Sequence, residues 1–417
     1  MRWPSTTIGQ LCLPTEQRDP TTSPDKPFRY IDISAIDKDA KRITTAPELL
    51  GAEAPSRARK AVRAGDVLVS TVRPNLNAVA VVPDELDGEI ASTGFCVLRT
   101  NPKLAEGKFI FYRCLTPEFV NSLIAQMRGA NYPAVSDGVV KRTDTPLPAR
   151  KEQRRIVELL EQADGLRRQR TEADTLADRI LPALFLKLFG DPARNSRSLP
   201  TERMERLAQV KRGDFRHRPR TEPRFYGGPY PFIQINDITA SGIIIRTHSQ
   251  TLNEKGLAIS RMFPAETVVV SIAATIAASG ILGFDSCFPD SLVGVRSRDK
   301  RTTQEYLLFY LRLMAAHLTR IAPQLAQKNI NLEILNALDV PVPQPHSLQL
   351  FTDAVKRFVA VEQRMASSHE MVDELWRAVI HRAFTGELTA KWREAHLKEL
   401  LAEVEHQARL LKSLRQG

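Results

Sequence analysis

The run Pro146-Leu147-Pro148-Ala149-Arg150 opens a long stretch of charged and apolar residues that closes at Phe189-Gly190. A second stretch of the same kind opens at Pro341-Val342-Pro343 and closes at Phe384-Thr385-Gly386. The offset between the two copies is 195 residues at both ends, from position 148 to 343 and from 189 to 384. This unit is much longer than the ~20–50 residues of a solenoid repeat. We therefore predict one polypeptide that imitates a symmetric dimer.

The repeat continues more loosely upstream of each long stretch. Tyr30-Ile31-Asp32-Ile33 is similar to Phe232-Ile233-Gln234-Ile235, and residues 65–70 are similar to residues 266–271. Each half is thus predicted to be one globular module followed by one long helix. The predicted segments are a first module (1–145), a long helix (146–195), a second module (196–340), a second long helix (341–388) and a C-terminal amphipathic helix (389–417).

Both modules are predicted to be α+β with mixed sheets. In the first, β-rich runs at 67–72, 78–82 and 94–98 precede a helical pattern at 109–124 that Thr116-Pro117 interrupts. The second module repeats this order, with strands around 232–235, 268–272 and 292–295 and a helix through 306–318. The predicted fold class is α+β, with two pseudo-symmetric α/β modules separated by two long antiparallel coiled-coil helices.

Apolar residues recur in alternating three- and four-residue steps along both long helices, which is typical of a coiled-coil seam. The matched lengths make each helix the natural partner of the other. The predicted seam of the first helix is Ile156, Leu159, Ala163, Leu166, Arg170, Ala173, Ala177, Ile180 and Leu184, and that of the second is Phe351, Val355, Phe358, Glu362, Met365, His369, Val372, Trp376, Val379 and Ala383.

The composition favours a polyanionic partner, because 59 Lys and Arg residues against 48 Asp and Glu residues give a net charge of +11. Many soluble proteins are also basic, so charge alone does not decide this. The four cysteines are far apart in the chain, which argues against a disulfide framework or a zinc knuckle. We expect a cytoplasmic protein, because neither a secretory signal nor a membrane-spanning apolar run is evident.

Motifs of catalysis are missing from the sequence. It has no phosphate-binding P-loop, no Gly-x-Gly-x-x-Gly dinucleotide motif and no methyltransferase motif, so we expect this chain to bind no cofactor and no metal ion. One pattern, Asp25 followed by Asp39 and Lys41, is similar to the metal-binding carboxylates and lysine of some nucleases. Such short acidic patterns arise readily by chance, and a solvated loop is the competing interpretation.

Polar turns beside the predicted strands are the candidate DNA contacts. Residues 70–77 carry Arg73, which could bridge guanine O6 and N7, and Asn75 and Asn77, which suit adenine N6 and N7. A plain hairpin turn is an equally good explanation of this segment.

Two further polar segments occupy matching places, after the helix of each module and before its Pro-x-Pro. Near the start of the second module a basic run is suited to phosphates, although charge runs are usually solvated surface. The candidate residues in these segments are Asn131 and Tyr132 in the first module, Gln327, Lys328, Asn329 and Asn331 in the second, and Lys211, Arg212, Arg216 and Arg218 in the basic run.

In the order and double occurrence of these motifs, the sequence resembles the specificity subunit of type I restriction-modification systems. The resemblance is carried by residues 146–156, which include Glu152-Gln153, by Ala383-Phe384-Thr385-Gly386-Glu387-Leu388, and by residues 65–74. It covers about residues 8 to 388. The second helix start, residues 345–351, lacks Glu-Gln, and residues 271–275 lack the Arg-Pro of the first module.

This resemblance implies a non-catalytic DNA-binding subunit. Each module would be a target recognition domain that binds one half of a split, asymmetric DNA sequence, and the helix pair would act as a ruler between the halves. Two methylation subunits would methylate adenine with S-adenosylmethionine, and restriction and translocation subunits would use ATP and magnesium. The alternatives are a recognition or scaffold subunit of another DNA-defence assembly or split restriction enzyme, and a nuclease that depends on Asp25, Asp39 and Lys41.

Overall fold

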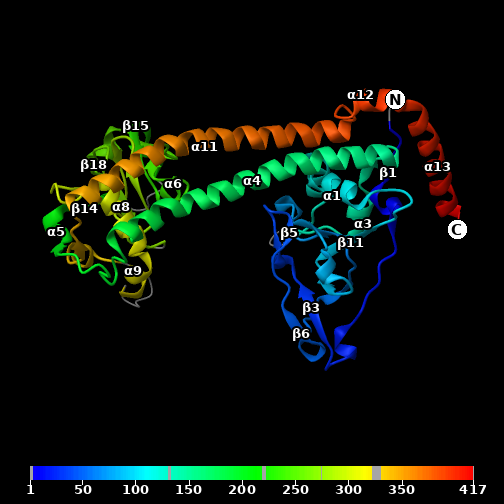
Figure 1. The fold of residues 1–417 in the computed structure, drawn as a ribbon, viewed down its shortest axis with the longest axis horizontal. Coiled ribbons are helices and arrows are strands. Elements are labelled where there is room, and N and C mark those ends of the chain that lie inside the picture. Colours follow the sequence, from blue (N-terminus) through cyan, green and yellow to red (C-terminus); the bar gives the residue numbers. More distant parts are fainter. Residues whose placement is uncertain (1–2, 130–132, 218–221, 274, 322–329, 417) are drawn as a thin grey trace. The chain divides into compact units, whose positions relative to one another are not determined.

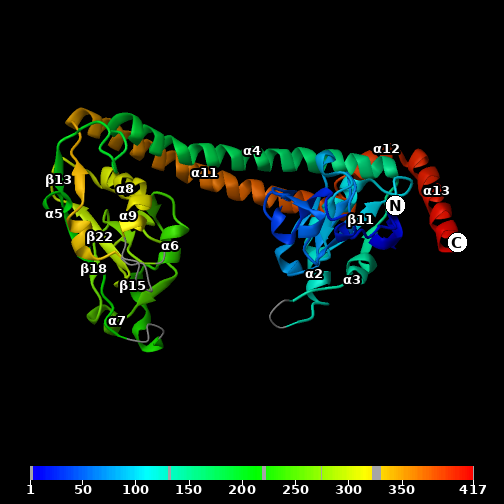
Figure 2. The same ribbon diagram turned by 90° about the horizontal axis from the view of Figure 1, so that it is seen from below.

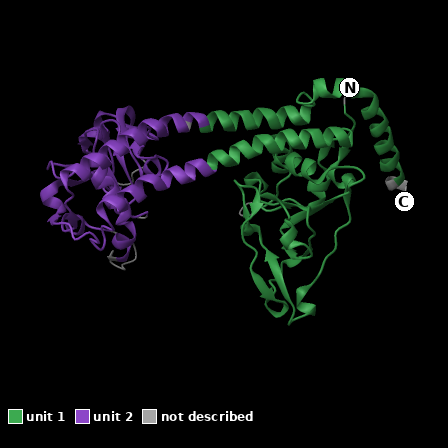
Figure 3. Ribbon diagram, viewed as in Figure 1, with its two compact units in different colours: residues 1–171, 369–417 green, residues 172–368 purple. Residues whose placement is uncertain are grey.

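The computed structural model describes residues 3–129, 133–217, 222–273, 275–321 and 330–416. The chain forms two compact units (Figure 3): unit 1 comprises residues 1–171 and 369–417, and unit 2 comprises residues 172–368. The boundaries between the units therefore fall within both long helices. The segments expected from the sequence are consecutive along the chain, and their bounds stay a prediction. Among the described residues, no helix is long and apolar enough to cross a membrane.

The module of unit 1 is α+β, as predicted. Its strands are β1 (Ser5–Thr7), β2 (Cys12–Leu13), β3 (Pro27–Ile31), β4 (Ile36–Asp37), β5 (Arg42–Ile43), β6 (Glu48–Leu50), β7 (Ala58–Ala61), β8 (Val67–Ser70), β9 (Val79–Val81), β10 (Ile90–Ser92), β11 (Phe95–Thr100) and β12 (Asp144–Pro146). Two sheets have the strand orders β6-β3-β10-β7 and β2-β11-β8-β9, while β1 pairs with β12 and β4 with β5. Every residue of β8 is buried, which explains its continuous apolar sequence.

The predicted break in the first helical pattern is confirmed. Helix α1 (Gly107–Leu115) ends before Thr116, and α2 (Pro117–Ile124) begins after it. The Thr116 hydroxyl accepts a hydrogen bond from the Phe119 backbone N–H at 3.2 Å, and proline is well suited to the first helical position because its missing N–H would be unpaired there anyway. A short helix, α3 (Asp137–Arg142), follows.

Unit 2 repeats this architecture. Its strands are β13 (Thr201–Arg203), β14 (Ala208–Arg212), β15 (Tyr226–Phe232), β16 (Ile244–Ile245), β17 (Gln250–Leu252), β18 (Met262–Phe263), β19 (Val268–Ser271), β20 (Ser279–Leu282), β21 (Ser286–Cys287), β22 (Leu292–Ser297) and β23 (Asp339–Pro341). The two larger sheets have the orders β14-β22-β19-β20-β16 and β17-β15-β21-β18. The helices are α5 (Met204–Leu207), α6 (Ile235–Thr239), α7 (Glu254–Ala258), α8 (Gln304–Leu313), α9 (Ala315–Ile321) and α10 (Leu332–Asn336).

One predicted strand is wrong at its end. Strand β15 stops at Phe232, and residues 235–239 form helix α6 instead of continuing the strand. The cause is local capping, because the Asp237 carboxylate accepts a hydrogen bond from the Gln234 backbone N–H at 2.7 Å.

Strand pairing confirms that the two modules are copies. In unit 1, β8 lies between β9 and β11, with Val67 opposite Val81 and Leu98. In unit 2, β19 lies between β20 and β22, with Val268 opposite Ile281 and Val295. The upstream similarity between residues 65–70 and 266–271 therefore marks structurally equivalent strands.

The long helices are α4 (Arg150–Phe189) and α11 (Pro345–Thr385), and within each unit they lie side by side (Figures 1 and 2). In unit 1, the start of α4 shares an apolar core with the end of α11, through Ile156 and Ala383 among others. In unit 2 the end of α4 packs against the start of α11, since the ring centroids of Phe185 and Phe351 lie 5.4 Å apart. The two helices are therefore antiparallel, as predicted.

The predicted seam of α4 is wrong in the middle of the helix. Leu166 and Ile180 are 57% and 55% exposed, whereas the neighbouring Leu181 is 3% exposed. The position beside Leu166 is taken by Arg167, whose guanidinium carbon lies 5.6 Å from the centroid of the Trp376 ring on α11. Because an α-helix drifts relative to a strict 3.5-residue repeat, the face that meets the partner moves by one residue along the helix.

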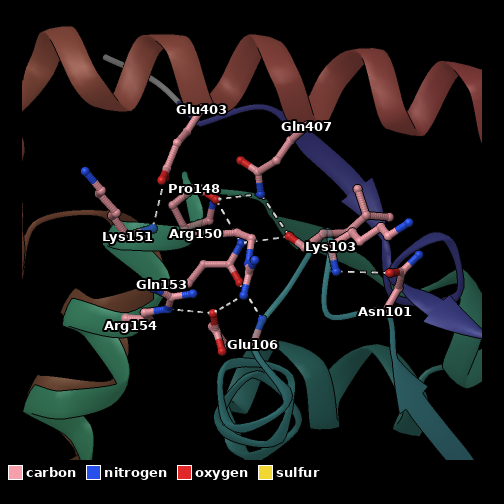
Figure 4. A network of polar contacts seen from close by, with 11 residues as sticks. Asn101, Lys103, Glu106, Pro148, Arg150, Lys151, Gln153, Arg154, Glu403 and Gln407 are labelled. Carbon is pink, nitrogen blue, oxygen red and sulfur yellow. Dashed lines mark hydrogen bonds and ion pairs between the residues drawn. The ribbon is translucent and has the colours of Figure 1, made fainter.

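The C-terminal segment forms α12 (Ala390–Ala395) and α13 (Leu397–Gln416), and α13 packs onto the start of α4 in unit 1 (Figure 4). The Gln407 side-chain amide donates to the Leu104 carbonyl oxygen at 2.8 Å. The Glu403 carboxylate accepts from the Lys151 backbone N–H at 3.0 Å, so it caps the helix start from a distant part of the sequence. The amphipathic pattern of residues 389–417 thus has its partner within unit 1.

A buried ion pair secures the same region. Glu152 accepts hydrogen bonds from Arg393 Nε at 2.7 Å, from the Thr389 hydroxyl at 2.7 Å and from Trp3 Nε1 at 2.9 Å. The side chains of Glu152 and Arg393 are only 2% and 11% exposed. Residues from near the N-terminus, from α4 and from α12 therefore meet in one network.

Candidate nucleic-acid interface

The loop from Ser70 to Ala78, which joins β8 to β9, carries the first group of predicted DNA contacts. The Ser70 N–H donates to the Ala78 carbonyl oxygen at 2.9 Å, and the Ser70 hydroxyl donates to the Val72 carbonyl oxygen at 2.9 Å. Both the backbone N–H and the hydroxyl of Thr71 donate to the Gly94 carbonyl oxygen. The segment is therefore a hairpin connection whose backbone is held by these hydrogen bonds. Its contact with DNA bases stays a prediction.

Two residues of this loop have left-handed backbone conformations. Arg73 has φ 48° and ψ 57°, and Asn77 has φ 46° and ψ 50°, on either side of the short turn at residues 74–76. Such conformations cost on the order of 1–3 kcal/mol each in non-glycine residues and persist only when the surroundings hold them. The Arg73 N–H donates to the Pro133 carbonyl oxygen at 2.8 Å. The side chains of Arg73 and Asn75 are exposed and that of Asn77 is half-buried.

Unit 2 has an equivalent loop after β19. The Ser271 N–H donates to the Ala278 carbonyl oxygen at 2.9 Å, the Ser271 hydroxyl donates to the Ala273 carbonyl oxygen at 2.7 Å, and Ala277 has φ 64°. The Ile330 N–H donates to the Ile272 carbonyl oxygen at 2.9 Å. In unit 1 the corresponding bond joins Val135 to Thr71, also at 2.9 Å. The two loops thus share a backbone frame, but only the first contains an arginine.

Two described residues that flank the polar segments before each Pro-x-Pro, Val135 and Ile330, are bonded to these loops. Asn131 and Tyr132, and likewise Gln327, Lys328 and Asn329, lie outside the described residues. Ala134, just after the first group, forms an antiparallel bridge with Val72. Asn331 has a structural role, because its side-chain oxygen caps α10 by accepting from the Ile334 N–H at 2.8 Å.

The basic run of unit 2 lies on and after β14. Lys211 and Arg212 are exposed, and Arg212 donates to the Asp290 carbonyl oxygen. Arg216 donates to the Asp214 carboxylate at 3.1 Å, and Arg218 lies outside the described residues. Arg261, which the sequence did not single out, donates to the Arg212 carbonyl oxygen at 2.7 Å and so adds a cation to this surface.

The loop of unit 1 also contacts a residue that the sequence suggested for another role. Lys41 donates from Nζ to the Asn77 carbonyl oxygen at 2.5 Å. Burial, together with the nearby positive charge of Arg167, lowers the pKa of Lys41 to about 8. Asp25 and Asp39 are exposed, and no group of three or more potential metal ligands occurs in the parts of the chain that the structure describes.

The cysteines are poorly suited to nucleophilic chemistry. Burial raises the pKa of Cys12 and of Cys96 to about 12, and it also raises the pKa of Cys114. These thiols therefore stay protonated near neutral pH and act as small apolar groups of the core.

Repeated α+β modules that carry matching loops and share an antiparallel helix pair define a class of two-module recognition proteins. Residues 207–362 match the family model of the type I restriction modification DNA specificity domain. A chain in a solved structure that concerns complex assembly and conformational transition of a type I restriction-modification system is 30% identical, with a TM-score of 0.60. The match covers 93% of this chain and 98% of that one. The chain belongs to the family of type I restriction-modification specificity subunits.

Two other relatives are more distant. The HindI specificity subunit of Haemophilus influenzae (strain ATCC 51907 / DSM 11121 / KW20 / Rd) is 27% identical over 139 residues, which is 33% of this chain and 30% of that subunit. The matched stretch thus spans less than a third of that relative. The S subunit of M. genitalium is 12% identical with a TM-score of 0.54, covering 92% of this chain and 96% of that one, and this likeness supports the fold alone.

Proposed function

We propose that this chain is the sequence-specific DNA-binding subunit of a type I restriction-modification complex, in which each module binds one half of a bipartite site. The observation that carries the proposal is the duplicated loop frame, with the same backbone bonds at Ser70 and Ser271. One frame carries Arg73 and two asparagines, while the other carries small residues, so the two half-sites differ in sequence. The net charge of +11 favours a polyanionic ligand.

In the first module, Arg73 is proposed to donate two hydrogen bonds to guanine, and Asn75 and Asn77 to bind adenine edges. Asn131 and Tyr132 are proposed to complete this surface. In the second module, Gln327, Lys328 and Asn329 are proposed to bind base edges in the same way, and Asn331 is proposed to contribute while its side-chain oxygen caps α10. Lys211, Arg212, Arg216 and Arg218 are proposed to bind phosphates, which positions the module without selecting a sequence.

The helix pair is proposed to set the distance between the two half-sites. An α-helix rises about 1.5 Å per residue and is stiff along its axis. Tying each module to both α4 and α11 would hold the number of unspecified base pairs constant.

The chemistry is proposed to reside in partner subunits. Two methylation subunits, one for each pseudo-symmetric half, would bring S-adenosylmethionine and methylate adenine. Restriction and translocation subunits would use ATP and magnesium, and this chain would bind no cofactor or metal ion itself. The complex would act in the cytoplasm, where its DNA substrate lies.

Methylation mapping tests this function. Cells that carry the chain together with its methylation partner should show adenine methylation in a two-part motif with a constant gap, and cells that lack only this chain should show none. The control is the same strain complemented with the chain on a plasmid, which should restore the motif.

A single undivided motif, or a motif that persists without the chain, would contradict the proposal. Purified chain that cleaved DNA with magnesium and lost this activity on Asp39→Ala would favour the nuclease alternative instead.

Replacing Arg73 by alanine should weaken binding to the cognate site by about 1–3 kcal/mol, because a bidentate contact to guanine is lost. Binding to duplexes with an altered first half-site should change little. The measurement is a titration of the assembled complex with both duplexes. Arg63→Ala removes an equal charge from an exposed arginine of unit 1 that pairs with Glu16, and should leave specificity intact. An equal loss on every duplex would make Arg73 a phosphate contact.

A further inference from the structure

We propose that Lys41 is a positioning residue that sets the base specificity of the first module by holding the Ser70–Ala78 loop, without itself contacting DNA. This inference rests on the proposed function. Its starting point is the hydrogen bond from Lys41 Nζ to the Asn77 carbonyl oxygen at 2.5 Å. Asn77 is one of the two left-handed residues that bracket the turn at residues 74–76, and Arg73 is the other. Losing this bond would release one end of the strained segment.

Lys41 belongs to a turn that is itself well defined. It closes the hairpin between β4 and β5, in which Asp37 lies opposite Arg42. The Lys41 N–H donates to the Asp37 carbonyl oxygen at 2.8 Å. The Asp37 carboxylate accepts from the backbone N–H groups of Asp39 and Ala40 at 2.8 and 2.9 Å, and these bonds lower the pKa of Asp37. The lysine is therefore presented to the loop by a rigid backbone.

The turn is also fastened to the long helices of unit 1. Arg167 on α4 donates to the Asp39 carbonyl oxygen at 3.1 Å. The same guanidinium lies over the Trp376 ring of α11, with its Nε 4.0 Å from the Asp373 carboxylate. A continuous set of contacts thus runs from the helix pair through the turn to the loop. The position of the loop is therefore fixed by contacts with the long helices as well as by its own hairpin.

The burial of Lys41 supports a specific role for this bond. Its pKa falls to about 8 because burial disfavours the charged amine, and Arg167 adds like-charge repulsion. A lysine whose only role was solubility would point into water instead. In unit 2 the equivalent loop closes on itself, because the Ala277 N–H donates to the Ser271 carbonyl oxygen at 2.9 Å. The longer loop of unit 1 contains Arg73, and Lys41 supplies a side-chain bond to it.

The test compares Lys41→Met, Lys41→Arg and the control Lys38→Met, which changes an exposed lysine of the same turn. Methylation mapping in cells with the partner subunit should show that Lys41→Met tolerates several bases in the first half-site. Methylation of cognate sites should fall roughly tenfold, the size expected for a lost hydrogen bond to a charged group. The second half-site and the gap should be unchanged, Lys41→Arg should retain most of the specificity, and Lys38→Met should match the wild type.

The second half-site in the same molecules serves as the folding control. A Lys41→Met chain with unchanged specificity in the first half-site would overturn the inference, and so would an equal loss at both half-sites, which indicates a purely structural role. A wild-type chain that gave no two-part motif would instead refute the proposed function.

Discussion

Replacing Glu152 by alanine is expected to destabilise unit 1 by about 3–5 kcal/mol, the cost of removing one partner from a buried ion pair. The change leaves the guanidinium of Arg393 with 11% exposure and no carboxylate, and it removes the acceptor of Trp3 and Thr389. All three tryptophans of the chain, at positions 3, 376 and 392, lie in unit 1. Urea unfolding followed by tryptophan fluorescence therefore reports on this unit alone, and its midpoint should fall.

Glu399→Ala is the matched control. It removes a glutamate that pairs with Lys151 in the same region, but both side chains of that pair are more than half exposed. Surface pairs contribute little, so the midpoint should stay close to that of the wild type. Similar shifts for the two variants would mean that Glu152 is not the anchor of this network.

Matched insertions of four helix-forming residues in α4 and α11 are expected to lengthen the gap between the half-sites. The insertion points are after Ala173 and after Ser367, each six residues beyond the contact between Arg167 and Asp373. Four residues add about 6 Å of helix, close to two base-pair steps of ~3.4 Å. Methylation at the original sites should fall on the order of 10³-fold or more, because only non-specific binding remains. Both half-sequences should reappear with a longer gap.

The same four residues inserted after Ser413, near the end of α13, provide the control and should leave the motif unchanged. An original gap that survived the helix insertions would show that α4 and α11 are tethers without a measuring role. A variant with α4 lengthened alone should lose methylation, because the facing residues of the antiparallel pair no longer meet.

The features that can be predicted from the sequence are those that depend on neighbouring residues, such as apolar runs and capping residues. The strands at Val67–Ser70 and Val268–Ser271 follow from continuous apolar runs, and the break at Thr116 follows from a capping residue before proline. The seam of α4 is less predictable, because stacking of Arg167 on Trp376 depends on a helix about two hundred positions away. Helix α6 is missed because the Asp237 carboxylate, which caps its start, gives no periodic signal in the sequence.

The candidate site is predictable in position but not in shape. Positive φ is not expected in a loop without glycine. Arg73 and Asn77 nevertheless adopt positive φ, and they contact Pro133 and Lys41, which are remote in sequence. Asp39 and Lys41 resemble part of a nuclease pattern, whereas in the structure the Asp39 carbonyl oxygen accepts a bond from Arg167 on α4 and the Lys41 side chain donates to the loop. Charge and residue type do not reveal such bonds.

The network around Glu152 also constrains the order in which the protein can fold during synthesis. Unit 2 consists of the continuous residues 172–368, so its core is complete once that stretch has left the ribosome. Unit 1 needs Arg393 and Gln407 to pair with groups made hundreds of residues earlier. At about 5–20 residues per second, the first module waits for tens of seconds without its closing contacts. During that interval the surface that α12 and α13 will cover stays exposed, so we expect these last helices to protect unit 1 from chaperones and proteases once they form.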